Sequence, residues 1–402
     1  MIIRVFIFIS LLFSGYLKAE IIFENGSNAM GIPFKNINDK MYLEITINDT
    51  LDKEVMFDTG MGFRGVLCLD PQVGTELGLI YQSSFELGGA GEDEGPLIAN
   101  VSMGNYISVP GVKISDQMLL VMTKERENIY NWPANAILGI SFFDSIVEID
   151  FEQEVINLYN PSYFDKSGYE EEIRIKSFSS GIPVIEVDIS INQEKEYPID
   201  LIVDTGCEVP FLYSFTSKDI LLPEKIHLTE SRILAEGMAG EMTGVMGRIS
   251  SLRLGEYDFE KVITIYPDQK SWEKATVLGQ DGIMGLSVLS QFNVVFDYAG
   301  NRILLKPNAN FGSPFEFENL GIVSQFDQDK NVEIVDVFLD SPAYKAGLLS
   351  GDIIRKIDGR KVSEISYEEL IDIIKQENVT IDLILIRDEE IINKTVKLLK
   401  FI

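Results

Sequence analysis

The chain contains very little histidine, cysteine or tryptophan, and its charge is one-sided. Its 402 residues include one His, two Cys and two Trp, and 34 Lys and Arg stand against 63 Asp and Glu, for a net charge of −29. The single His227 excludes a His-rich metal site and leaves one residue for any catalysis that pairs a nucleophile with histidine. The acidic excess disfavours nucleic acid and anionic lipid as partners, because both are negatively charged.

The composition also argues against a fold held together by disulfides and against a disordered chain. Cys68 and Cys207 could pair in an oxidising compartment, but two cysteines make no disulfide framework. With 46% hydrophobic residues, 24 Phe and 15 Tyr, the chain can bury a core and is not an acidic disordered protein. At about 150 residues per domain, the length suggests two or three domains.

The apolar run near the N-terminus is too short to cross a membrane. It extends from Val5 to Leu17, whereas a spanning helix needs about 20 residues. Arg4 precedes the run and the small Ala19 follows it, a pattern typical of a secretory signal peptide. We therefore expect residues 1–19 to be a signal peptide cleaved near Ala19, and an exported (periplasmic or secreted) protein without a stable membrane anchor.

An internal repeat is the strongest signal in the sequence. The triplet Asp-Thr-Gly occurs at residues 58–60 and 204–206, each time after an apolar run. An apolar pair followed by Gly ends at Gly139 and again at Gly285, in each case 81 residues after the aspartate. A single triplet is usually a strand that ends in a turn. Two triplets with matched partners indicate a duplicated unit in which the aspartates act together.

The repeated units have the pattern of β-structure. Apolar and polar residues alternate or nearly alternate over 42–47 and 184–191, as they do in half-buried strands. Helical patterns are scarce between residues 20 and 307. We therefore expect a mainly β protein in which residues 20–165 and 166–308 each form a small β-barrel lobe.

Together the triplets and the two apolar-apolar-Gly segments resemble those of the aspartic peptidases, over about residues 23 to 307. Pepsin-like enzymes carry two such lobes in one chain, and retropepsins build the same site from two identical subunits. This chain looks like two fused retropepsin-type units, so no dimer is needed and we expect a monomer. The resemblance implies an aspartic endopeptidase that acts on polypeptides, with Asp58 and Asp204 as its catalytic residues.

The implied chemistry needs no metal or other cofactor. Two carboxylates held close together share one proton and titrate as a pair. The ionised member takes a proton from a water molecule while the protonated member polarises the scissile carbonyl. By resemblance, the two threonines hydrogen-bond across the lobes and the glycines let the backbone approach the site. The supporting positions are Thr59, Gly60, Thr205, Gly206, Gly139 and Gly285.

A glycine-rich turn follows each triplet and suits a flap over the substrate. A hairpin at such a turn could grip an extended peptide through its backbone amides, although an ordinary hairpin turn is the alternative. The residues concerned are Gly88, Gly89, Gly91, Gly237 and Gly240.

The sequence departs from the family pattern just after each triplet. Met61 and Cys207 stand where pepsin-like enzymes have Ser or Thr and retropepsins have Ala, and Glu208 adds a negative charge nearby. These differences keep open a second interpretation, a catalytically weak or inactive protein that binds peptides as a scaffold.

The C-terminal part follows a linker at 308–314 and has a different pattern. Ser341 and Ser366 each precede a short helical segment, Ser366 in a capping box. Residues 315–402 resemble a PDZ domain of the bacterial kind. The resemblance implies that peptide C-termini add as a strand, with the carboxylate held by backbone N–H groups of Leu320, Gly321 and Ile322. The alternative is a domain that packs on the lobes and binds nothing.

Overall fold

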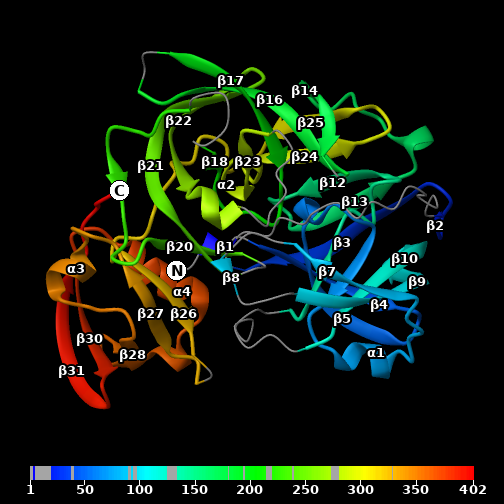
Figure 1. Cartoon of the computed structure of the whole chain (residues 1–402). Helices are drawn as coiled ribbons and strands as arrows, with labels where there is room; N and C mark the ends of the chain where they lie inside the picture. Colours follow the sequence, from blue (N-terminus) through cyan, green and yellow to red (C-terminus); the bar gives the residue numbers. More distant parts are fainter. Residues whose placement is uncertain are drawn as a thin grey trace.

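The computed structural model describes twelve stretches of the chain, within which strands predominate and form three sheets (Figure 1). The stretches are 3–4, 20–37, 40–88, 92–93, 97–124, 134–179, 181–192, 195–213, 220–237, 240–272, 280–327 and 329–402. The fold is mainly β, as the sequence predicts.

The first sheet holds most of the first repeat. Its 14 strands are β2 (Ile21–Phe23), β3 (Asn28–Asn36), β4 (Met41–Ile47), β5 (Leu51–Phe57), β6 (Gly65–Cys68), β7 (Ser83–Leu87), β9 (Leu97–Val109), β10 (Val112–Met122), β11 (Ala136–Leu138), β12 (Ile146–Asp150), β13 (Val155–Tyr159), β14 (Glu171–Arg174), β24 (Phe292–Asp297) and β25 (Arg302–Pro307). The strand order is β14-β25-β24-β12-β13-β3-β4-β5-β11-β6-β10-β9-β7, with β2 beside β10.

The second sheet belongs mainly to the second repeat. Its 11 strands are β1 (Ile3–Arg4), β8 (Glu92–Asp93), β15 (Ser177–Ser179), β16 (Ile182–Ser190), β17 (Glu196–Val203), β18 (Phe211–Leu212), β19 (Ile226–His227), β20 (Ile233–Gly237), β21 (Gly240–Leu254), β22 (Tyr257–Pro267) and β23 (Gly282–Met284). The strand order is β1-β20-β21-β22-β18-β23-β17-β16-β15, and both β8 and β19 pair with β21.

The third sheet forms the C-terminal domain. Its strands are β26 (Ile322–Phe326), β27 (Val332–Val337), β28 (Ile353–Ile357), β29 (Arg360–Lys361), β30 (Thr380–Arg387) and β31 (Glu390–Lys397). They lie in the order β26-β27-β28-β30-β31, with β29 beside β28, so β26 is an edge strand.

Helices are few and short in the described part of the chain. They are α1 (Gln72–Glu76), α2 (Leu286–Leu289), α3 (Pro342–Ala346) and α4 (Tyr367–Lys375), with 3-10 turns η1 (Thr59–Met61), η3 (Pro161–Tyr163), η4 (Gln269–Trp272) and η5 (Val362–Glu364). None of the described helices has the length and apolar character needed to cross a membrane. As predicted, the side chains of Ser341 and Ser366 cap α3 and α4, and each accepts a hydrogen bond from the backbone three residues ahead.

The predicted strands form where alternation indicated them. Residues 42–47 lie in β4, and 184–191 lie almost entirely in β16. Their inward side chains enter one hydrophobic core that also contains residues of the other repeat. Burial of that alternating face stabilises both sheets and fixes their register.

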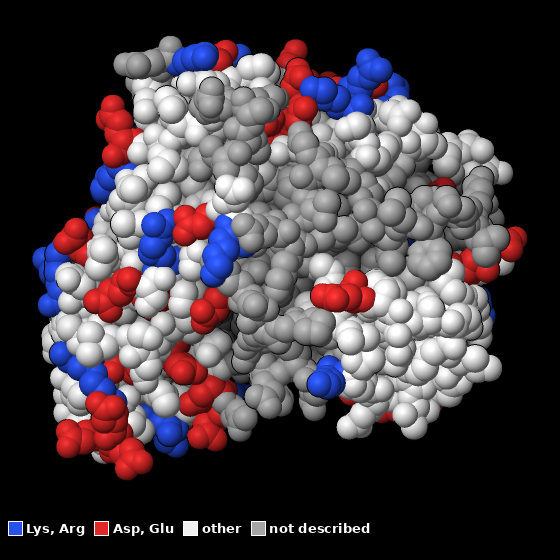
Figure 2. All heavy atoms as spheres, viewed as in Figure 1, with Lys and Arg blue, Asp and Glu red and all other residues white. Residues whose placement is uncertain are grey.

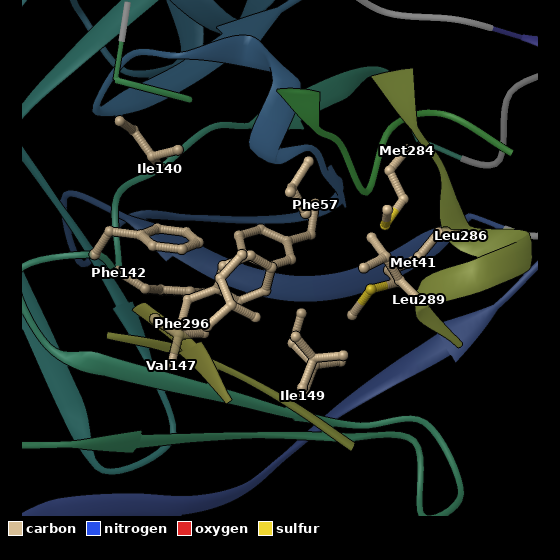
Figure 3. Packing of buried hydrophobic residues seen from close by; sticks show 14 of the residues in the cluster. Met41, Phe57, Ile140, Phe142, Val147, Ile149, Met284, Leu286, Leu289 and Phe296 are labelled. Atoms are coloured by element: carbon tan, nitrogen blue, oxygen red, sulfur yellow. The ribbon is translucent and has the colours of Figure 1, made fainter. Parts of the chain in front are cut away.

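The two repeats are joined by direct pairing of β12 with β24. Val147 lies opposite Phe296 and Ile149 opposite Val294 in this antiparallel pair. Figure 3 shows Phe57, Phe142 and Phe296 packed together in the shared core. The Phe296 ring also lies edge-on to Phe143, with 5.4 Å between the ring centroids. The strand that precedes the first aspartate is therefore anchored in a core supplied by both repeats.

The C-terminal domain is bound to the second repeat at the segment leading into β20. Asp336 accepts hydrogen bonds from the backbone N–H groups of Ser231 and Ile233, at 2.9 and 3.2 Å. The backbone N–H of Leu339 donates to the carbonyl of Leu228. Phe338 is fully buried in a cluster that combines residues of the second repeat with residues of this domain.

Charged side chains are unevenly spread on the face shown in Figure 2. Asp and Glu gather, with Lys and Arg among them, over the C-terminal domain and the adjoining edge of the second sheet. The surface over β4, β5 and α1 shows few charged groups in this view. The acidic residues are therefore not evenly distributed over the part of this face that is described.

We expect Phe296→Ala to destabilise the protein by about 3 to 5 kcal/mol, because it opens a cavity where the two repeats join. Phe296→Leu, which keeps most of the buried volume, should lose much less. Urea unfolding followed by circular dichroism measures both. Equal midpoints for Phe296→Ala and the wild type would contradict a core shared at β24.

Candidate active site

Each Asp-Thr-Gly triplet begins where a buried strand ends. Asp58 follows β5 and Asp204 follows β17, and these strands run parallel to β11 and β23, the two apolar pairs found in the sequence. The backbone N–H of Asp58 donates to Leu138 at 2.9 Å, and that of Asp204 donates to Met284 at 3.1 Å. The matched spacing of the repeats thus produces two equivalent supports for the aspartates.

The triplets face each other with almost no space between them. A Cβ placed on Gly60 would collide with the carboxyl group of Asp204, and one on Gly206 would collide with that of Asp58. Only glycine fits at either position, since any side chain would push the opposite carboxylate aside. The structure therefore brings the two aspartates together, as the duplicated triplet implied.

The two threonines exchange hydrogen bonds across the junction of the repeats. The backbone N–H of Thr59 donates to Oγ1 of Thr205, and that of Thr205 donates to Oγ1 of Thr59, both at 3.0 Å. Each hydroxyl in turn donates at 3.1 Å to a carbonyl of the opposite strand, Thr59 to Val203 and Thr205 to Phe57. These four bonds between fully buried groups fix the separation of the triplets.

The carboxylates are buried but poorly supplied with hydrogen bonds. Asp58 and Asp204 both have an exposed fraction of 0%. The N–H of Gly206 donates to Oδ1 of Asp204 at 2.7 Å, whereas the other three carboxylate oxygens accept no hydrogen bond from the described residues. Buried acceptors of this kind are suited to bind a water molecule or a substrate group.

Burial favours the protonated form of both aspartates. It raises the pKa of Asp58 well above the ordinary value, and the charge of Asp204 raises it further. Burial also raises the pKa of Asp204, to about 6, while the neighbouring Asp58 carboxyl group and the Gly206 N–H oppose the rise. Asp204 also receives the Gly206 N–H, and a hydrogen bond of this kind favours the ionised form of a carboxyl group.

A buried lysine that the sequence did not single out lies beside the pair. Lys40 has an exposed fraction of 3%, and its Nζ donates to the carbonyl of Gly206 at 2.6 Å. Its positive charge lowers the pKa of both Asp58 and Asp204, and so opposes the effect of burial. No motif marks Lys40, which lies between β3 and β4, 18 residues before Asp58 and 164 before Asp204.

The residues that follow the two triplets, Met61 and Cys207, point to other neighbours. Met61 is buried in an apolar cluster of the first repeat, and the Cys207 thiol donates to the carbonyl of Val209. Cys68 and Cys207 are both buried free thiols, so they form no disulfide. Burial raises the pKa of Cys207 well above its ordinary value, which makes it a poor nucleophile. Glu208 is also buried, next to the second triplet.

Gly139 and Gly285 lie just after β11 and β23, against the loops that follow the triplets. A Cβ on Gly139 would collide with the backbone of Phe63, and one on Gly285 with the backbone of Cys207 and Glu208. Because these two positions have no Cβ, the loop that follows each triplet can lie in direct contact with the backbone of the glycine.

Of the predicted flap residues, Gly88, Gly237 and Gly240 are described, whereas Gly89 and Gly91 lie outside the described residues. β20 and β21 pair up to Gly237 and Gly240, so the second turn does close a hairpin. β8 of the first repeat pairs with the start of β21, next to the turn of this hairpin, with Asp93 opposite Gly240. The segments after the two triplets thus meet each other near the middle of the molecule (Figure 1).

The predicted carboxylate-binding residues of the C-terminal domain lie at the start of β26. The backbone N–H groups of Leu320, Gly321 and Ile322 converge on one carboxylate, which belongs to Glu318. The sequence indicated the nest but not the acidic side chain within it.

We expect Thr205→Val to destabilise the protein by about 2 to 4 kcal/mol, since it leaves the N–H of Thr59 and the carbonyl of Phe57 buried without this partner. Thr205→Ser keeps the hydroxyl and should remain close to the wild type. Thermal unfolding of the two variants measures the difference. Indistinguishable stabilities would show that the exchange of hydrogen bonds does not hold the triplets.

Comparison with known proteins found two similarities. Residues 333–385 match the family model of the PDZ domain. No curated protein matches the sequence. Among solved structures, the chain is similar to an aspartic proteinase from Irpex lacteus, with 12% identity, 74% of this chain and 100% of that chain covered, and a TM-score of 0.41. The described part of the chain is mainly β, and its C-terminal part contains the stretch that matches the PDZ domain model.

Proposed function

We propose that the protein is an aspartic endopeptidase in which the Asp58/Asp204 pair activates water to hydrolyse peptide bonds. The observation that carries this proposal is the reciprocal fit of the triplets, in which each glycine faces the opposite carboxylate and each threonine bonds to the other. A buried pair that shares one proton holds an acid and a base a short distance apart. Peptide hydrolysis by water needs both groups at once.

The two aspartates have different roles in the proposed reaction. Ionised Asp204 takes a proton from a water molecule held between the carboxylates, and the resulting hydroxide attacks the scissile carbonyl carbon. Protonated Asp58 donates a hydrogen bond to the carbonyl oxygen as negative charge develops on it. The tetrahedral intermediate collapses when its amine nitrogen receives a proton from the pair, which restores the starting charge state.

The PDZ domain would serve this activity by binding peptide C-termini or by controlling access to the site. Its contacts with the segment that enters β20 support the second role, because β20 carries the predicted flap turn at Gly237. We also propose that the protein is exported after cleavage near Ala19 and acts as a monomer, with domains at 20–165, 166–308 and 315–402.

A peptide-binding scaffold without turnover is the second candidate. It is favoured by the absence of a hydroxyl donor at positions 61 and 207, which leaves the outer carboxylate oxygens without that support.

We expect Asp58→Asn and Asp204→Asn each to reduce peptide hydrolysis by at least roughly 100-fold, because each removes one half of the acid–base pair. Release of fragments from a denatured protein substrate, measured across pH 3 to 8 with and without pepstatin, gives the readout. Asp144→Asn is the matched control, since Asp144 pairs with Arg64 and not with either aspartate of the pair. Full activity in either dyad variant would contradict the proposal, and inactivity of the wild type across this range would favour the scaffold.

We expect Lys40→Met to move the acid limb of the pH profile for kcat/KM toward higher pH. Activity rises as Asp204 ionises, near pH 6, and falls at higher pH when Asp58 loses its proton. A positive charge lowers the pKa of a carboxyl group, so removing Lys40 raises the pKa of Asp204 and delays its ionisation. Lys35→Met is the control, because Lys35 is exposed and pairs with Glu54. An acid limb that stays in place or moves down would exclude a role for the Lys40 charge.

A further inference from the structure

The carboxylate nest of the PDZ domain already holds a carboxylate from the same chain. Oε2 of Glu318 accepts the backbone N–H of Leu320 at 2.6 Å, and its Oε1 accepts that of Ile322 at 2.9 Å. The N–H of Gly321 lies 2.9 Å from both oxygens. All three donors of the nest are therefore directed at one side chain. That side chain has an exposed fraction of 3%.

The surrounding structure holds Glu318 in this position. The next residue, Asn319, donates from its backbone N–H to the carbonyl of Ile374 and from its side chain to that of Lys375, at the end of α4. Gly321 has φ +87°, which favours glycine, and a Cβ there would collide with Ser341. The nest and its occupant are thus fixed between α4 and α3.

A peptide C-terminus offers the same chemical group that Glu318 supplies. Three convergent N–H groups can satisfy one carboxylate at a time, so two carboxylates compete for them. β26, which begins at the nest, is an edge strand of its sheet, where a peptide could add as a further strand. Apolar side chains of the nest and of α4 pack together beside it, among them Ile322, Leu370 and Ile374.

We propose that Glu318 is an internal ligand of the PDZ domain, which closes the nest to peptide C-termini until they displace it. This inference rests on the proposed peptide-binding role of the domain. A peptide with a free C-terminal carboxylate must break the contacts of Glu318 before it binds. The apparent affinity is then reduced by the fraction of molecules in which the nest is closed.

The first test measures occupancy of the nest without any peptide. Amide hydrogen exchange is followed at Leu320, Gly321 and Ile322 in the full chain carrying Asp58→Asn, which prevents proteolysis. We expect Glu318→Ala to speed exchange of these amides at least tenfold, because their acceptor is gone. Glu318→Gln should give a smaller increase, since its amide oxygen still accepts. Glu316→Gln is the matched control, because it removes the same charge from an exposed position two residues away.

The second test measures competition in the same proteins. The probes are fluorescein-labelled decapeptides that end in each of the 20 amino acids as a free carboxylate, and the same peptides with a C-terminal amide. We expect Glu318→Ala to bind at least one of the free-carboxylate peptides about ten times more tightly than the parent protein does. The affinity of Glu318→Gln for that peptide should lie between the two. The peptides with a C-terminal amide should bind no more tightly to the variants than to the parent.

The results distinguish the internal-ligand role of Glu318 from peptide binding by the domain. Unchanged amide exchange in Glu318→Ala, or equal peptide affinity in parent and variant, overturns the internal-ligand proposal and leaves peptide binding by the domain intact. Faster exchange with no carboxylate-dependent binding in any variant overturns both. Faster exchange with tighter carboxylate binding supports both. If Glu318→Ala proves unfolded by circular dichroism, the same criteria apply to Glu318→Gln.

Discussion

The exchange of hydrogen bonds between Thr59 and Thr205 is the constraint on which the site depends. It ties the two strands that carry the aspartates to each other, N–H to hydroxyl and hydroxyl to carbonyl, in a fully buried place. The carboxylates would otherwise separate, because their mutual repulsion and the loss of water both oppose close burial. The shared core and the β12–β24 pairing supply the packing that keeps this exchange in register.

Buried acidic side chains are stabilised in two different ways in this molecule. At the dyad, burial pushes toward protonation, and the positive charge of Lys40 opposes it, so that the pair can hold one proton and one negative charge. At the PDZ nest, three backbone N–H groups are directed at the buried carboxylate of Glu318 and stabilise its charged form, which opposes the rise in its pKa caused by burial. In both places a buried acidic group is retained because specific partners compensate its desolvation.

Much of the architecture could be predicted from local pattern. Alternation located β4 and β16, Ser341 and Ser366 marked the starts of α3 and α4, and the repeat marked the apolar pairs that form β11 and β23. These features depend on hydrogen bonds and burial over a few residues, so they leave a local trace in the sequence. The lack of a disulfide could not be predicted, since it depends on where Cys68 and Cys207 are buried.

The sequence by itself determined which groups could do chemistry: one histidine, two matched aspartates, and glycines at the positions where backbones must pass. Only the tertiary structure decided what surrounds those groups. Lys40 reaches Gly206 from a turn more than a hundred residues away, β8 meets β21 across the repeats, and Glu318 folds back into the nest. Such contacts arise when whole sheets pack against one another. The number of residues between two side chains does not determine how close that packing brings them.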